Sequence, residues 1–129
     1  MDTKQVIVIR RDLKMRRGKE IAQGSHASMA FITKRMLRCL ESTNTPYAYM
    51  SDAERAWIRS SFRKITCQVD SLEEMLELAD KAKEAGLEVH VIEDNGLTEF
   101  GGVKTVTALA IGPDYCEKID PVTNHLRLY

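Results

Sequence analysis

Apolar positions along this chain repeat with two periods, one typical of strands and one typical of helices. Short runs of β-branched and apolar residues predict strands, which we place at residues 5–10, 65–69, 87–92 and 103–111. Apolar residues three, four and seven apart predict amphipathic helices, which we place at residues 18–40, 51–58 and 72–82. Strands that alternate with amphipathic helices predict an α/β fold in which helices cover a mixed sheet.

The boundaries of the helices are marked by local signals. The first helix carries an apolar stripe made of Ala22, Met29, Ile32, Met36 and Leu40. Asn44-Thr45-Pro46 is a helix-breaking sequence after it. Two capping boxes, Ser51 with Glu54 and Ser71 with Glu74, predict the starts of the next two helices.

The last third of the chain predicts a strand pair and a short helix. About ten residues join the strands 87–92 and 103–111, so these strands fit an antiparallel pair with a long loop. A last short helix is expected at 114–119, after Gly112-Pro113. The tail Leu126–Tyr129 fits either an edge strand or a docked end.

Length and composition fit one globular domain, which we take to span residues 1–129. Hydrophobic residues make up 43% of the chain and charged residues 29%, which is ordinary for such a domain. No apolar run is long enough to cross a membrane, and the N-terminus does not resemble a signal peptide. Cys39, Cys67 and Cys116 form neither a disulfide framework nor a zinc-binding spacing, which favours the reducing cytoplasm.

Charge is balanced over the whole chain but concentrated in one segment. Nineteen basic and nineteen acidic residues exclude a protein that binds polyanions over its entire surface. Between the first strand and the first helix stand Arg10, Arg11, Lys14, Arg16, Arg17 and Lys19, against the single carboxylate of Asp12. This segment is either a solvated loop or a surface for an anionic partner, phosphate or nucleic acid, near a helix N-terminus.

Two groups of polar residues are candidates for chemistry. Lys19, Gln23 and His26 are spaced four and three apart on one helix face, although His26 alone also fits a half-buried structural histidine. Asp94 and Thr98 follow a strand and can present an acid and a hydroxyl to a cleft. The alternative for Asp94 is an Asx turn that only reverses the chain.

Four blocks of the sequence together resemble the type II peptidyl-tRNA hydrolase family. They are residues 8–27, 86–98, 105–113 and 124–129, in the order of the family. The resemblance implies a mixed four-stranded sheet flanked by helices on both faces, and often a homodimer. It also implies hydrolysis of the ester between a peptide and the 3′ end of tRNA, without a metal or another cofactor.

The resemblance further implies a set of site residues. Its catalytic positions correspond to Lys19, His26, Asp94 and Thr98. Its substrate-binding positions correspond to Lys14, Gln23 and a strand threonine, which is Thr107 or, with a poorer fit, Thr105. The other cations of the segment, Arg10, Arg11, Arg16 and Arg17, would face the phosphates of the acceptor stem.

The general base stays open at this point. Asp94 and His26 can each position the attacking water, but an unperturbed aspartate, with a pKa near ~3.9, is a poor base at neutral pH. Histidine side chains have the better intrinsic value, near ~6.5. Lys19 would stabilise the developing negative charge, and Thr98 would hydrogen-bond substrate or water.

The chain departs from the family pattern at four positions and in one segment. Arg16 stands where glycine is usual, Gly24 where cysteine or alanine is common, Asn95 where alanine is usual and Glu99 where glutamine is frequent. The region 40–62 also looks longer. Two other functions are considered: a non-catalytic module that binds RNA or a protein, and a hydrolase of other aminoacyl-tRNA esters.

Overall fold

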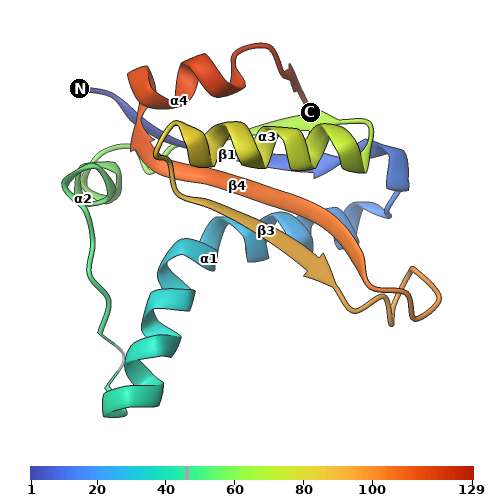
Figure 1. Ribbon diagram of the computed structural model, residues 1–129, viewed down its shortest axis with the longest axis horizontal. Helices are drawn as coiled ribbons and strands as arrows, with labels where there is room; N and C mark the ends of the chain where they lie inside the picture. Colours follow the sequence, from blue (N-terminus) through green and yellow to red (C-terminus); the bar gives the residue numbers. More distant parts are fainter. Residues whose placement is uncertain (46) are drawn as a thin grey trace.

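The predicted α/β fold is confirmed by the computed structural model, which describes residues 1–45 and 47–129. The strands among these residues are β1 (Thr3–Arg10), β2 (Lys64–Val69), β3 (Val89–Asp94), β4 (Thr105–Tyr115) and β5 (Arg127–Leu128). The helices are α1 (Arg17–Thr43), α2 (Asp52–Arg59), α3 (Leu72–Glu84) and α4 (Cys116–Thr123), with a short 3-10 turn at Arg11–Leu13. Figure 1 shows these elements arranged around one sheet.

The sheet is mixed and has the strand order β3-β4-β1-β2-β5. β1 and β2 are parallel, while β4 runs antiparallel to both β1 and β3. Four of these strands are those predicted from the sequence. The C-terminal tail adds the fifth, because Leu128 pairs with Cys67 at the border of β2.

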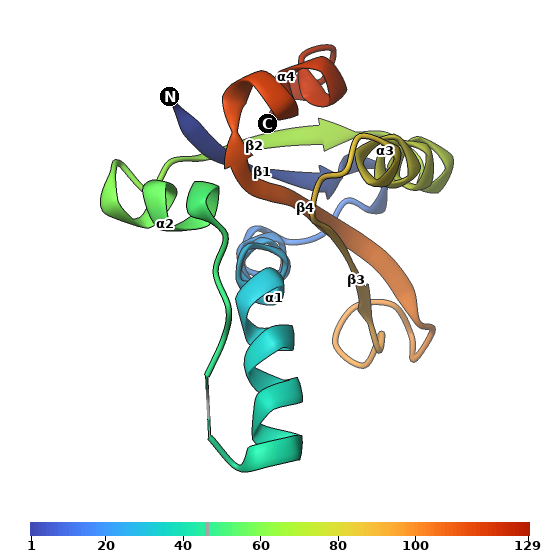
Figure 2. The ribbon, with the colours of Figure 1, turned by 60° about the vertical axis from the view of Figure 1, so that its left-hand side comes forward.

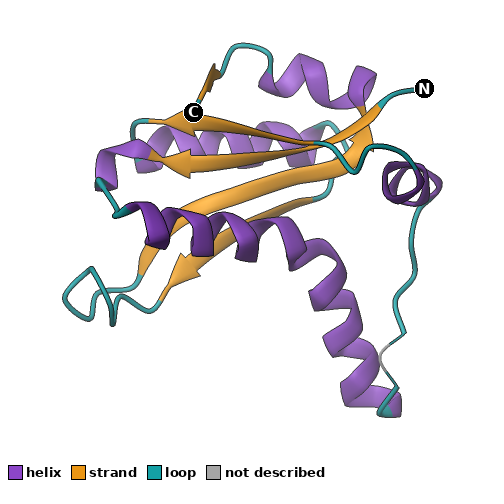
Figure 3. Cartoon of the chain, turned by 180° about the vertical axis from the view of Figure 1, so that it is seen from behind, coloured by secondary structure: helices purple, strands orange, loops and turns teal. Residues whose placement is uncertain are grey.

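Helices cover both faces of the sheet, as Figure 2 and Figure 3 show. On one face, α3 and α4 pack against β1, β2 and β4 through Val6, Val8, Val69, Met75, Leu78, Leu109, Ile111 and Ile119. On the other face, α1 packs against β1 and β4 through Ile7, Ile9, Ala27, Ala108 and Ala110. Within residues 1–45 and 47–129, no helix combines the length and the apolar character needed to cross a membrane.

Helix α1 turns a different face to the sheet from the one its apolar stripe predicted. Its buried residues are Gln23, Ala27, Ser28, Ala30 and Phe31. Ala22 is exposed and Met29 is 57% exposed, so the predicted stripe was wrong at these positions. The buried polar residues have partners: Ser28 Oγ donates to Gln5 Oε1 at 2.6 Å, for example. Because a hydrogen-bonded polar group costs little to bury, a mixed polar and small-residue face can replace an apolar one.

Strand β4 is longer than predicted at its C-terminal end. The short helix expected at 114–119 begins only at Cys116, because Asp114 still pairs with Lys4 of β1. Gly112 lies within the strand with φ of 86°, and a Cβ there would come within 3.1 Å of Lys4 O. A glycine can take this conformation, so the strand bends at Gly112 and continues.

Within the region 40–62, helix α2 packs against α1. Trp57 of α2 packs edge-on against Phe31 of α1, with ring centroids 6.0 Å apart. The capping box of Ser51 and Glu54 is confirmed at the start of α2. Pro46, in the predicted helix breaker, lies outside the described residues.

A buried ion pair holds α2 against α1. Arg35 donates to both carboxylate oxygens of Glu54, at 2.7 and 2.8 Å, and to Glu88 at 3.1 Å. Glu54 is 1% exposed. Burial by itself raises the pKa of Glu54, but hydrogen bonds from Arg35 and from the Ser51 backbone lower the pKa below its ordinary value.

Replacing Glu54 with alanine is expected to destabilise the fold by roughly 1–3 kcal/mol, because the Arg35 guanidinium loses its two-oxygen partner and keeps only Glu88 and Tyr49 O. Urea unfolding at pH 7 measures this loss, with the exposed Asp70→Ala as control, expected to cost under about 1 kcal/mol. Because the folded pKa of Glu54 is lowered, its contribution is present above the ordinary pKa of 4.5 and is lost as the pH falls through the folded value. Equal losses in the two variants would contradict the structural role of Glu54.

Candidate active site

Two segments that are far apart in the sequence meet at one corner of the α1 face. Lys19 lies in the first turn of α1, Asp94 is the last residue of β3, and Thr98 lies in the loop between β3 and β4. The parts of the chain that carry them are more than 70 residues apart, as the Lys19–Asp94 contact shows with a separation of 75. The fold therefore assembles three predicted catalytic residues into one cluster.

Lys19 is the centre of this cluster. Its Nζ donates to Asp94 Oδ1 at 3.0 Å and to Thr98 Oγ1 at 2.7 Å. The side chains of Lys19 and Asp94 are 12% and 13% exposed, so the pair is shielded from bulk water but still reachable. Since Thr98 Oγ1 accepts a hydrogen bond from Lys19, its own hydroxyl hydrogen stays available for a substrate oxygen.

A buried glutamine extends the hydrogen-bonded chain into the core. Gln23 Nε2 donates to Asp94 Oδ1 at 3.3 Å, and Gln23 Oε1 accepts from Thr107 Oγ1 at 2.5 Å. Gln23 is 2% exposed and Thr107 is 0% exposed. Thr105, the other threonine considered, donates instead to Val103 O at 2.9 Å. The network thus runs from Thr107 through Gln23 and Asp94 to Lys19.

A β-bulge directs Thr107 toward α1. The β3–β4 ladder pairs Ile92 with Ala108 and Glu93 with Val106, which leaves Thr107 as an additional residue in β4. A bulge breaks the strict alternation of side chains between the two faces of a sheet. Thr107 bonds to Gln23 of α1, and its neighbour Ala108 packs on the same face of the sheet.

The carboxylate of Asp94 is surrounded by donors. Its hydrogen bond from Lys19 lowers its pKa most, and the Gly96 backbone N–H, 2.9 Å from Oδ2, lowers it further; together they outweigh the effect of burial. The carboxyl therefore stays ionised at neutral pH. Asp94 can therefore form an Asx turn and belong to the site at the same time. Its Oδ2 accepts from the Gly96 N–H of the turn, and its Oδ1 accepts from Lys19.

His26 lies beside this network on α1. It lines a cleft of about 500 Å³ together with Gln23 and Asp94. The rest of the lining is Ala30, Thr33 and Lys34 from α1 and residues 91–93 and 95 from β3 and the following loop. His26 is exposed rather than half-buried. A histidine and a carboxylate therefore border the same cleft.

The cations of the basic segment fall into two groups. Arg10 is engaged within the fold: it donates to Asp12 at 2.6 Å and to Val106 O at 3.0 Å. Arg11, Lys14, Arg16 and Arg17 are exposed around the start of α1. The exposed cations thus lie at the same helix end as Lys19.

Two of the departures from the family pattern contact each other. Arg16 Nε donates to Glu99 Oε1 at 2.7 Å, which ties the start of α1 to the loop that carries Thr98. The Arg16 hydrogen bond and, beyond it, the nearby Arg16 and Lys19 charges lower the pKa of Glu99. Arg16 and Glu99 both differ from the family pattern, and this shared departure is the signal in the sequence that could have indicated their contact.

A glycine holds the loop between β3 and β4 in shape. Gly96 has φ of 82°, and a Cβ there would lie 2.1 Å from Val103 O. The Gly96 carbonyl accepts from the N–H groups of Phe100 and Gly102, at 3.2 and 2.9 Å. No larger residue fits this position, so Gly96 fixes the loop that presents Thr98.

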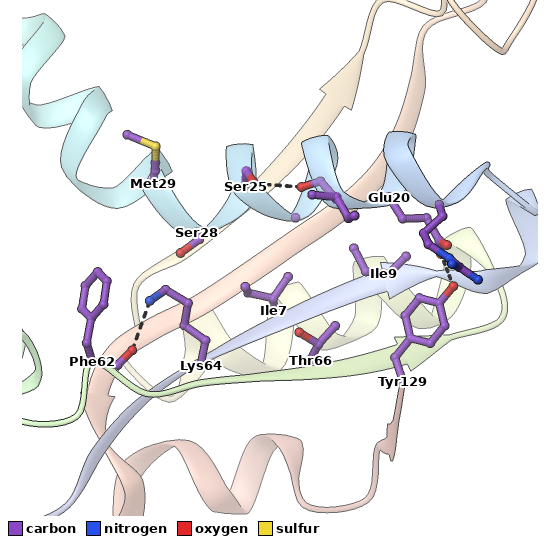
Figure 4. Close-up of a pocket in the computed structure, with 13 residues that line it drawn as sticks. Ile7, Ile9, Glu20, Ser25, Ser28, Met29, Phe62, Lys64, Thr66 and Tyr129 are labelled. Atoms are coloured by element: carbon purple, nitrogen blue, oxygen red, sulfur yellow. Dashed lines mark hydrogen bonds between the residues drawn. The ribbon is translucent and has the colours of Figure 1, made fainter.

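A larger hollow lies on the other side of α1, between that helix and strands β1 and β2 (Figure 4). Its volume is about 820 Å³, and its walls are mainly apolar, with Ile7, Ile9, Met29 and Phe62 among them. At one end, Tyr129 OH donates to Glu20. The hollow contains none of the Lys19, Gln23, Asp94, Thr98 cluster.

No three side chains of the histidine, cysteine, aspartate or glutamate type come together as a metal-binding group within residues 1–45 and 47–129. All three cysteines in this part of the chain are free thiols.

Comparison with known proteins gives one consistent result. Residues 3–129 match the family described as "Peptidyl-tRNA hydrolase PTH2". The chain is 38% identical over 125 residues to the peptidyl-tRNA hydrolase of Methanothermobacter thermautotrophicus, covering 97% of this chain and 98% of that protein. It is 42% identical over 125 residues to the enzyme of the same name from Methanopyrus kandleri, covering 97% of each.

A eukaryotic relative is longer. The "probable peptidyl-tRNA hydrolase 2" of Dictyostelium discoideum is 39% identical over 128 residues, covering 99% of this chain and 55% of that protein. The family match spans nearly the whole chain, and each of these relatives is matched over 97% or more of it. The chain therefore belongs to the peptidyl-tRNA hydrolase PTH2 family.

Proposed function

We propose that this protein hydrolyses peptidyl-tRNA at the corner where α1 meets the end of β3. The observation that carries the proposal is the Lys19–Asp94–Thr98 contact, at 3.0 and 2.7 Å, beside a cleft that His26 also lines. The bond cleaved is the ester between the peptide carbonyl and a ribose oxygen of the 3′ terminal nucleotide. The products are the peptide carboxylate and free tRNA.

The lowered pKa of Asp94 favours His26 as the general base. Asp94 accepts hydrogen bonds from Lys19, Gln23 and Gly96, so little basicity is left at its oxygens. The water oxygen attacks the ester carbonyl carbon while the His26 imidazole takes the water proton. Asp94 is a positioning residue in this scheme, because it holds the Lys19 ammonium in place.

The remaining steps use Lys19 and Thr98. The attack converts the carbonyl oxygen into an oxyanion, which accepts hydrogen bonds from Lys19 Nζ and from the Thr98 hydroxyl. The intermediate then collapses, the bond between the carbonyl carbon and the ribose oxygen breaks, and the ribose oxygen takes the proton from the His26 imidazolium. The peptide leaves as the carboxylic acid, which releases the second water proton to solvent and becomes the carboxylate, and the His26 imidazole is free for the next turnover.

The exposed cations at the start of α1 are the proposed surface for the acceptor stem. Arg11, Lys14 and Arg17 are exposed next to Lys19 and suit phosphate oxygens, which carry no base sequence. We leave Arg10 out of this surface because Asp12 and Val106 O hold it. Arg16 is 79% exposed at its side chain and can contribute beside Glu99.

We also propose that the protein acts in the cytoplasm as a homodimer. Three free thiols suit a reducing compartment.

The homodimer is proposed from the apolar hollow between α1 and β2. The exposed side chains of Ile21, Met29 and Phe62 border this hollow, and a second copy of the chain can cover such a surface.

Asp94→Asn and Lys19→Ala are each expected to slow release of N-acetyl-amino acid from N-acetyl-aminoacyl-tRNA by about a hundredfold or more, because each disables the oxyanion donor. Single-turnover assays with saturating enzyme measure this, and gel shifts should show tRNA binding retained. Asp80→Asn and Lys81→Ala on α3, the opposite face, are the matched controls. Full turnover in either site variant would refute its role, and cleavage of free aminoacyl-tRNA at the same rate would favour the alternative esterase.

The pH dependence of kcat/KM is expected to separate His26 from Asp94. The pKa of Asp94 lies below its ordinary 3.8, so protonation of this carboxyl removes activity only below that pH. A loss of activity on acidification that sets in well above that pH therefore does not come from Asp94, and the His26→Asn variant tests whether it depends on the imidazole. We expect His26→Asn to lose this limb together with most of the rate. An unchanged limb in that variant would exclude His26 as the base.

Binding of deacylated tRNA is expected to weaken as the salt concentration rises. In a plot of log K against log salt, each neutralised phosphate should contribute roughly −0.7 to −0.9 to the slope. Arg11→Gln, Lys14→Gln and Arg17→Gln should each reduce the slope by about one such unit, uniformly across tRNAs. Arg59→Gln on α2 serves as the control. A salt response that none of the three changes would place the RNA elsewhere.

A further inference from the structure

Strand β3 borders the sheet and has a neighbour on one side only. β4 pairs with it through residues 105–111, and no other strand among residues 1–45 and 47–129 adjoins it. Figure 3 shows β3 at the border of the sheet, with α1 running beside it. An unpaired strand edge presents backbone N–H and C=O groups that can pair with another extended chain.

The hydrogen-bond pattern identifies which groups point outward. Gly112 N–H donates to Glu88 O at 2.9 Å, so the residue in register with Gly112 directs its backbone toward β4. In an antiparallel ladder this direction alternates from residue to residue. Val89, Val91 and Glu93 therefore direct their N–H and C=O groups away from β4.

These outward groups border the cleft that contains the proposed site. Val91 and Glu93 line the cleft of about 500 Å³, together with Asp94. The opposite wall is α1, where Ala30 and Thr33 follow His26 along the helix. The cleft therefore continues from Asp94 back along the open edge of β3, between the strand and the helix.

We propose that the last residues of the peptide in peptidyl-tRNA bind as an added strand on the open edge of β3. The inference rests on the proposed function, which places the ester carbonyl at Lys19 and Thr98. Backbone pairing holds a peptide without reading its side chains. It therefore suits an enzyme whose substrates carry peptides of any sequence.

The position of the ester sets the direction of this strand. β3 runs toward the site, because Asp94 is its last residue. The peptide also runs toward the site, because its C-terminal carbonyl is esterified to the tRNA. The two strands are consequently parallel, and Val91 N–H and C=O bond to two peptide residues that lie two positions apart.

The added strand predicts that kcat/KM depends on the N–H group of every second peptide residue, which can be measured with wild-type protein. Substrates are tRNAs that carry N-acetyl-tripeptides, unmodified or N-methylated at the first, second or third residue from the ester. In a parallel pair, every second peptide residue donates its N–H to β3. N-methylation should therefore lower kcat/KM by about two- to tenfold at alternate residues, and leave the others unchanged.

Two variants of β3 test the strand side of the same contact. Val91→Pro removes the outward N–H without touching the β4 ladder, a change that edge strands tolerate. It should lower kcat/KM on the unmodified tripeptidyl-tRNA, because one peptide carbonyl loses its N–H donor. Val91→Ile keeps the N–H and the β-branched side chain, and should keep the wild-type kcat/KM. Thermal unfolding of both variants checks that the fold is retained.

The outcomes separate this proposal from the proposed function. Release from none of the substrates by wild-type protein would overturn the function itself. Equal kcat/KM for the three N-methylated substrates would overturn the added strand alone. Equal kcat/KM of Val91→Pro and Val91→Ile on the unmodified substrate would do the same. Sedimentation tests whether a second copy of the protein, rather than the peptide, pairs with β3. A wild-type dimer that dissociates in Val91→Pro and persists in Val91→Ile would show that it does, and would overturn the proposal.

Discussion

The ion pair between Lys19 and Asp94 is the contact on which the rest of the site depends. It joins the first turn of α1 to the end of β3, at 3.0 Å and with both side chains only slightly exposed. A shielded charge pair is stable only when its other hydrogen-bonding groups are also satisfied. Gln23, Gly96 and Thr98 meet this need, and the first two of them also lower the pKa of the carboxyl.

The loop between β3 and β4 is held by contacts at both of its ends and by its own turns. Gly96 closes it against Val103, where a Cβ would have no room. Glu99 then binds Arg16 at the start of α1. A loop fixed in this way can keep the Thr98 hydroxyl near Lys19 without rearrangement during the reaction, which is what electrostatic stabilisation of an oxyanion requires.

Much of the fold and most of the cluster were predictable because local signals agreed with one another. Strand runs, capping boxes and the six cations are short-range features, and β-branched runs or Ser-x-x-Glu spacings carry their own physical reasons. The apolar stripe predicted the wrong buried face of α1. Helical periodicity shows which residues are apolar, but it does not show which polar residues find hydrogen-bond partners on the sheet. Gln23 and Ser28 are buried because β4 and β1 offer Thr107 and Gln5.

Local patterns in the amino-acid sequence account for the alternation of strands and helices, the basic segment, and the spacing of Lys19, Gln23 and His26 on one helix face. Packing between distant elements accounts for the contact of Asp94 with Lys19, for the contact of Arg10 with Val106 O, and for Thr107 rather than Thr105 facing α1. These contacts join residues 75, 96 and 84 positions apart, and the last also depends on a bulge in the β3–β4 ladder. Such relations follow from packing between elements, which no local pattern encodes.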